Sequence, residues 1–101
     1  MESLGTIIRK LRDERKLPLR TVAAFLDIDQ AILSRVERGQ RKVNRDQVIK
    51  LAQYFNASED ELLIAWLSDK VLYDVANEEL GLQALIAAEE RVKYQILKKQ
   101  K

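Results

Sequence analysis

Apolar residues recur every three or four positions along most of the chain, and this spacing predicts an all-α fold. The first such stripe predicts a helix capped by Ser3 and ending near Lys16. Its apolar residues are Leu4, Ile7, Ile8 and Leu11, and its arginines, which we expect to remain exposed, are Arg9, Arg12 and Arg15. Residues 19–38 contain two shorter patterns, separated at residues 27–29, that predict two short helices joined by a tight turn. Because helices this short are unstable alone, their apolar faces must pack on a common core.

Residues that favour the first or last positions of helices indicate where the helix boundaries lie. Pro18 suits the start of the second helix, and Asp29 suits the N-cap of the third. Gly39 is expected to end the third helix with a left-handed residue, and Asn56 is expected to end the fourth.

Two capping-box patterns and one break organise the rest of the chain. Asn44 with Gln47 begins a fourth helix that extends to about Phe55, and Ser58 with Glu61 begins a fifth. Residues 77–81 form a break before a last helix that extends to about residue 98.

The outward face of the predicted third helix is polar. Leu33 and Val36 give this helix its buried face. The residues left outside are Gln30, Ala31, Ser34, Arg35 and Arg38. Short, amide and guanidinium side chains of this kind suit the major groove of DNA. We therefore interpret residues 19–38 as a DNA-binding helix-turn-helix motif.

The distribution of charge is more informative than its total of +2. Residues 1–45 contain eleven Lys/Arg and six Asp/Glu, a net charge of +5, whereas residues 56–90 contain one lysine and nine acids, a net charge of −8. Ordinary solvated helix faces could produce a basic half. Its coincidence with the helix-turn-helix favours a molecule that turns its basic side toward a polyanion.

Composition argues against an enzyme, a metal site and a membrane protein. Among the 101 residues there is no cysteine and no histidine, which excludes disulfides, thiolate sites and the commonest general base. No P-loop or Rossmann glycine pattern occurs, so we expect no cofactor. No apolar run approaches the roughly 18 residues of a membrane span, and no secretory signal opens the sequence. A cytoplasmic protein of a bacterium or phage, associated with the nucleoid, is expected.

Several short segments follow one another in order along about sixty residues of the chain: residues 8–12 (IRKLR), Val22, Ala23, Leu26, Ile28, residues 33–39 (LSRVERG), Leu51, Ala52, Phe55 and residues 60–63 (DELL). With these segments, residues 4–64 resemble the Xre/Cro-repressor family of five-helix helix-turn-helix domains. The resemblance implies a DNA-binding domain over residues 1–64, with the motif at 19–38 and the recognition helix at about 30–38. It also implies that Glu37 is structural and pairs with a nearby arginine. For Arg35, the alternative to a DNA contact is a surface ion pair with Glu37 or Glu14.

The resemblance also implies which side chains meet DNA. The expected base-contacting residues are Gln30, Ala31, Ser34 and Arg35, while Ile32 either touches a thymine methyl group or packs inward. The expected phosphate-contacting residues are Arg20, Arg38, Arg41, Lys42 and Arg45. Two departures concern the motif itself. Leu19 stands where the family often has a glutamine that contacts phosphate, and Asp27 replaces the glycine of the turn. Aspartate tolerates a left-handed backbone, so we expect the turn to persist.

Residues 65–98 form a helical extension with more apolar residues than a five-helix core can bury, followed by a tail at residues 99–101. The extension is predicted to form a dimer interface through Trp66, Leu67, Val71, Leu72, Val75, Leu82, Leu85 and Ile86. The alternative is that the last helix folds back on its own domain. Because Glu89 and Glu90 interrupt the heptad pattern, a long coiled coil is not expected.

The function expected from these features is that of a homodimeric repressor that reads a palindromic operator, as in phage repressors or restriction–modification controllers. The alternative is an antitoxin, whose acidic C-terminal helices neutralise a partner protein while its basic half binds DNA. The two hypotheses differ in what the C-terminal helices bind.

Overall fold

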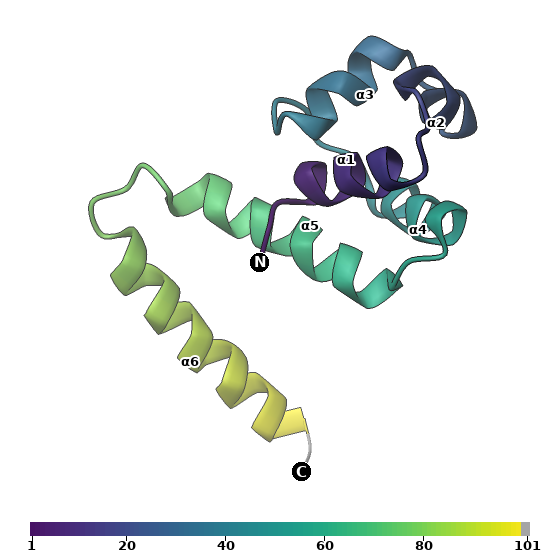
Figure 1. Ribbon diagram of the computed structural model, residues 1–101. Coiled ribbons are helices and arrows are strands. Elements are labelled where there is room, and N and C mark those ends of the chain that lie inside the picture. The colour runs from purple at the N-terminus through teal and green to yellow at the C-terminus, as the bar shows by residue number, and fades with distance from the viewer. Residues whose placement is uncertain (100–101) are drawn as a thin grey trace. The chain divides into compact units, whose positions relative to one another are not determined.

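A computed structural model describes residues 1–99, which form six helices and no strand (Figure 1). The helices are α1 (Leu4–Glu14), α2 (Leu19–Phe25), α3 (Gln30–Glu37), α4 (Arg45–Phe55), α5 (Glu59–Val75) and α6 (Gly81–Lys99). The predicted all-α fold with a C-terminal helical extension is therefore confirmed. The expected tail at 99–101 lies outside the described residues except for Lys99, which ends α6.

Side-chain caps begin the helices where the sequence predicts them. The Ser3 hydroxyl accepts a hydrogen bond from the Thr6 amide at 3.2 Å, and the Asp29 carboxylate accepts one from the Ala31 amide at 2.8 Å. Asn44 forms a complete capping box with Gln47, with distances of 2.8 and 2.9 Å. These bonds satisfy amides that have no partner inside a helix, so local sequence sets the N-terminal starts of α1, α3 and α4.

Left-handed residues follow the ends of four helices, α1 to α4. Asp27, Gly39 and Asn56 have φ angles of 57°, 75° and 52°, as predicted for the turn and for the two helix ends. The expected end of the first helix near Lys16 is two residues too late. Lys16 itself is left-handed, with φ of 54°, and a right-handed helix cannot pass through that conformation.

The first five helices share one core. In Figure 1, the α2–α3 pair lies on one side of α1, and α4 and the first part of α5 lie on the other. The side chains that are essentially inaccessible to solvent come from all five helices: Ile8, Val22, Leu33, Val48, Leu51, Phe55 and Leu62. Packing of this kind replaces the intrinsic stability that helices as short as α2 and α3 lack.

The core extends further along α5 than the expected domain of residues 1–64. The chain divides into two compact units, Met1–Asp69 and the part from Lys70 onward. Ala65 is fully buried, and the carboxylate of Asp69 accepts a hydrogen bond from the Leu4 amide at 3.0 Å. Trp66, expected at a dimer interface, is only 8% exposed and belongs to this core.

The second unit is formed by the end of α5 and by α6. α5 stops at Val75 and α6 starts at Gly81, which confirms the predicted break. Gly81 is buried against the Val75 carbonyl, and a Cβ atom at this position would collide with that oxygen. The large apolar side chains of this unit are mostly exposed, among them Val71, Leu72, Leu82, Ile86, Val92, Ile96 and Leu97.

Candidate nucleic-acid interface

α3 presents one face to the core and the opposite face to solvent. Leu33 and Val36 are buried and Ile32 packs partly against the core, which favours the inward alternative for Ile32. The expected base-contacting residues lie on the other side: Gln30, Ala31 and Arg35 are exposed, and Ser34 is partly so. The face of α3 that lies opposite the core is therefore a short polar surface on an otherwise anchored helix.

The turn between α2 and α3 is compact and is closed by backbone hydrogen bonds. The Ile28 amide donates to the Ala23 carbonyl at 3.0 Å, and the Asp27 amide donates to the Ala24 carbonyl at 3.1 Å. Ala23 is buried, so its small side chain allows the turn to close against the core. Leu19, which replaces the family's glutamine, packs partly into this core, while Arg20 beside it is exposed.

A largely buried ion pair joins the last turn of α3 to α1. The Arg12 guanidinium donates to both oxygens of Glu37, at 2.8 and 3.0 Å, and its third hydrogen bond goes to the Leu17 carbonyl at 2.9 Å. The side chains are 13% and 5% exposed. The hydrogen bond to Glu37 raises the pKa of Arg12 above its ordinary value, against the lowering effect of burial. The predicted pairing of Glu37 with an arginine is confirmed, and the expectation that Arg12 is exposed is wrong.

This pair also decides the alternative raised for Arg35. Both Glu37 oxygens are occupied by Arg12, and among residues 1–99 no ion pair involves Arg35. The Arg35 guanidinium therefore remains exposed on the outward face of α3.

The same end of α3 is approached by the backbone of α1. A Cβ atom built on Gly5 would lie 2.5 Å from both the Val36 and the Glu37 carbonyl oxygens. Only glycine permits this approach, which sequence reasoning missed. The signal in the sequence was a glycine in the first turn of a helix. Glycine there lowers helix stability by up to about 1 kcal/mol relative to alanine, so its presence indicates a close packing contact.

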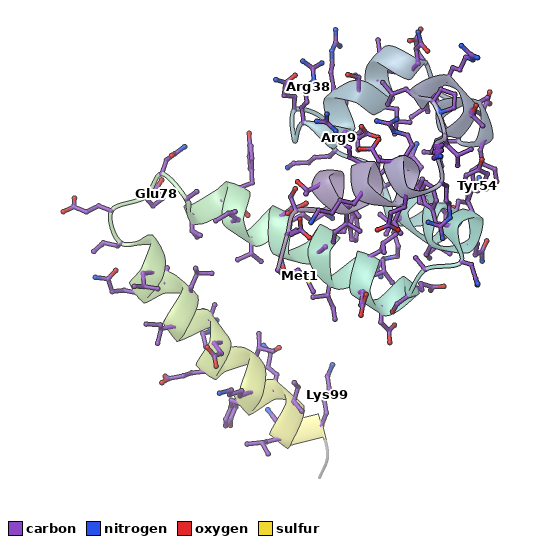
Figure 2. All side chains as sticks on the ribbon, in the orientation of Figure 1. Met1, Arg9, Arg38, Tyr54, Glu78 and Lys99 are labelled. Atoms are coloured by element: carbon purple, nitrogen blue, oxygen red, sulfur yellow. The ribbon has the colours of Figure 1, made fainter. Side chains whose placement is uncertain are left out.

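The five expected phosphate-contacting residues are all exposed. Arg20 lies on α2, Arg38 follows α3, Arg41 and Lys42 lie in the loop between α3 and α4, and Arg45 begins α4. Arg38 extends outward from the end of α3, and its Nε donates to the Ser34 carbonyl at 3.3 Å (Figure 2). The Arg45 guanidinium lies 5.2 Å from the centre of the Trp66 ring.

Trp66 links α5 to this basic loop. Its indole Nε1 donates to the Val43 carbonyl at 2.8 Å, and the Val43 side chain is itself buried. The hydrogen bond from Trp66 and the burial of Val43 thus fix the end of the loop, next to Lys42 and Arg45. The signal that could have found this role is that a buried tryptophan needs an acceptor for its N–H group, which a purely apolar interface lacks.

We predict that Trp66→Phe will lower the free energy of unfolding by about 2 kcal/mol, because the bond to the Val43 carbonyl is lost and the phenyl ring fills only part of the space of the buried indole. Denaturation followed by circular dichroism measures this change. Hydrogen exchange of amides in residues 40–44 should accelerate at the same time. Tyr94→Phe, which removes a hydroxyl from an exposed ring, is the control and should alter neither quantity. Unchanged exchange in the loop of Trp66→Phe would show that the indole does not hold it.

Other kinds of site are not apparent in residues 1–99. No group of three or more acidic side chains is arranged to hold a metal ion. None of the helices in this range combines the length and apolar character needed to cross a membrane.

Comparisons with known proteins agree with this geometry. Residues 8–62 match the family described as helix-turn-helix. Over 50 residues the chain is 42% identical to the HTH-type transcriptional repressor RghR of Bacillus subtilis (strain 168), an alignment that covers 50% of this chain and 37% of that protein. The chain thus matches only about a third of the length of this relative. No solved structure shows significant similarity to the chain.

Proposed function

Because the chain belongs to the Xre-type helix-turn-helix family, we propose that it regulates transcription, as a repressor, by binding double-stranded DNA with α3 in the major groove. The observation that supports this most directly is the two-sided nature of α3. Its inner face and last turn are fixed by the core, by Arg12 and by the approach of Gly5, while its outer face is polar and exposed. We expect no catalytic activity, and we expect the protein to act in the cytoplasm at the nucleoid.

In this proposal, the exposed face of α3 reads base edges. Gln30 pairs with the N6 and N7 atoms of adenine, and Ala31 contacts a thymine methyl group. Arg35, one turn further along, donates to the O6 and N7 atoms of guanine, with Ser34 beside it. Each good bidentate pair contributes about 1–3 kcal/mol of discrimination against the wrong base.

The surrounding cations position the protein without reading sequence. Arg20, Arg38, Arg41, Lys42 and Arg45 are proposed to contact phosphates on both sides of the groove. Each contact releases condensed counterions, so the affinity falls as salt rises. In this arrangement Arg20 takes over the phosphate contact that the family's glutamine makes at the position of Leu19.

We predict that Arg35→Ala will weaken binding to the operator by about 1–3 kcal/mol and relax base preference at one step, because it removes a base contact. Lys42→Ala should weaken binding to all sequences alike and reduce the slope of log K against log salt by about 1, because it removes a phosphate contact. Selection from a random DNA library followed by fluorescence anisotropy at several salt concentrations measures both.

The paired variants also show what would contradict the assignment. If Arg35→Ala and Lys42→Ala weakened all sequences equally, α3 would not be the reading helix. If the wild-type protein selected no sequence from the library, the proposal of a specific regulator would fail.

We further propose that the protein acts as a homodimer on a palindromic operator, because one recognition helix covers only half of a typical site. The extension supplies the interface through Leu67, Val71, Leu72, Val75, Leu82, Leu85 and Ile86, whereas the core position of Trp66 removes it from this set. Sedimentation velocity tests this proposal. A dimer is expected, and a monomer that associates only with a second protein encoded beside it would favour the antitoxin alternative.

A further inference from the structure

α6 carries an apolar face without a covering partner in its own unit. Positions spaced by three and four residues lie on one side of an α-helix. On α6 these positions include Leu82, Leu85, Ile86, Val92 and Ile96. All of them are more than half exposed except Leu85, which is partly buried. A solvent-exposed apolar stripe of this length is unusual unless another helix covers it.

The same stripe contains one acid and one base in its middle. Glu89 lies seven residues after Leu82, and Lys93 lies seven residues after Ile86, so both share the face of the apolar residues. The Lys93 ammonium and a Glu89 carboxylate oxygen are 2.9 Å apart. Their mutual hydrogen bond raises the pKa of Lys93 and lowers the pKa of Glu89, so both groups are charged near neutral pH.

Three pairs of side chains on this face are placed symmetrically about residue 91. Glu89 and Lys93 are each two residues from it, with opposite charge. Ile86 and Ile96 are each five residues from it, and Leu85 and Leu97 are each six. When a second copy of the helix is reversed about this point, Glu89 meets Lys93, Ile86 meets Ile96 and Leu85 meets Leu97, while Val92 and Glu90 meet each other at the edge of the face.

We propose that α6 pairs in antiparallel orientation with α6 of a second copy of this chain, about a twofold axis near residue 91. Glu89 of each copy then faces Lys93 of the other, and the two ion pairs join into a network of four charges. This inference rests on the proposed homodimer and specifies its geometry.

The parallel arrangement is disfavoured by the same residues. In a parallel pair, equivalent positions lie side by side, so Glu89 would meet Glu89 and Lys93 would meet Lys93. Like charges at neighbouring positions destabilise helix pairing. The exposed charges contribute little affinity, which the apolar residues supply, but they select one orientation over the other.

A charge-swapped variant tests the orientation directly. In Glu89→Lys/Lys93→Glu, the antiparallel homodimer regains opposite charges, whereas an antiparallel mixed dimer with the wild type brings acid to acid and base to base. A parallel mixed dimer would instead bring opposite charges together. The swap does not change the mass, so one protein must carry ¹⁵N before native mass spectrometry of the mixture.

We expect both proteins to form homodimers and the mixed dimer to fall at least severalfold below its statistical share. A mixed dimer in excess would indicate parallel pairing, and a statistical share would show that these charges do not direct association; either result overturns the inference while leaving the homodimer intact. Monomers of both proteins would remove the proposed homodimer itself. The DNA-binding proposal is tested separately by Arg35→Ala.

Cross-linking gives an independent reading, since the chain contains no cysteine. In the antiparallel pair, residue 85 of one copy lies beside residue 97 of the other and about 18 Å along the axis from residue 85 of that copy. A mixture of Leu85→Cys and Leu97→Cys proteins should therefore be cross-linked by a short bismaleimide far more than either alone. Efficient cross-linking of Leu85→Cys with itself would contradict the antiparallel arrangement.

Discussion

Glu37→Ala is expected to lower the free energy of unfolding by about 3 kcal/mol, because it leaves the Arg12 guanidinium largely buried with two donors unpaired. The cost arises from the uncompensated charge more than from the lost attraction. Urea denaturation followed by circular dichroism measures it. Loosening of the last turn of α3 should also weaken operator binding, measured by anisotropy at a temperature where the variant is folded.

A double-mutant cycle isolates the contribution of the pair. Arg12→Ala should also be destabilising, and the double variant should be less destabilised than the sum of the two single changes, because no unpaired charge remains in it. Glu2→Ala breaks the exposed ion pair of Glu2 with Lys10 and serves as the control, with little change in stability expected. Additive effects of Glu37→Ala and Arg12→Ala would show that the two side chains do not depend on each other.

Gly5→Ala is expected to lower the free energy of unfolding by about 2 kcal/mol, although alanine is the better helix former by about 1 kcal/mol. The added methyl group would lie 2.5 Å from the Val36 and Glu37 carbonyl oxygens, and α1 must move away from α3 to accommodate it. Because those neighbours are backbone atoms, they cannot rotate aside as a flexible side chain would. Denaturation measures the loss, and amide chemical shifts should change at the end of α3.

Gly39→Ala is the matched comparison. No atom lies within 4 Å of a Cβ built at Gly39, so its cost comes only from the left-handed φ of 75° and should be about 1 kcal/mol. Its shift changes should be confined to the residues around the turn. A Gly5→Ala protein as stable as the wild type, or more stable, would mean that the close approach of α1 to α3 does not occur.

The features that the sequence predicted best depend on residues close to one another along the chain. Asn44 and Gln47 are three residues apart, and their capping box forms wherever a helix starts there. Asp27 and Asn56 are among the few side chains that tolerate a left-handed backbone, so their positions mark the turn and the helix end.

The features that could not be predicted depend on how whole helices turn toward one another. Arg9, Arg12 and Arg15 repeat every three residues and look equivalent in the sequence. In the structure Arg9 forms an exposed pair with Asp13, Arg12 binds Glu37, and Arg15 donates to the Phe55 carbonyl. Small differences in angle around α1 separate these roles, and spacing alone does not resolve them.

The placement of Trp66 illustrates the same limit. α5 has apolar residues on more than one side, and the excess indicates that some of them must find partners outside the five-helix core. Which residues these are depends on the rotation of α5 about its axis. That rotation turns Trp66 toward the Val43 carbonyl and leaves Ile64 and Leu67 exposed.

The position of Trp66 has a spectroscopic consequence. It is the single tryptophan of the chain, so the tryptophan fluorescence of the protein arises from one site. That site lies where the core meets the basic loop, with the Val43 carbonyl at the indole nitrogen and the Arg45 guanidinium over the ring. Movement of Arg45 or of the loop changes the electric field at the indole and shifts the wavelength of its fluorescence emission maximum. The intrinsic fluorescence of the protein therefore reports conformational changes of its proposed phosphate-binding loop without an added dye.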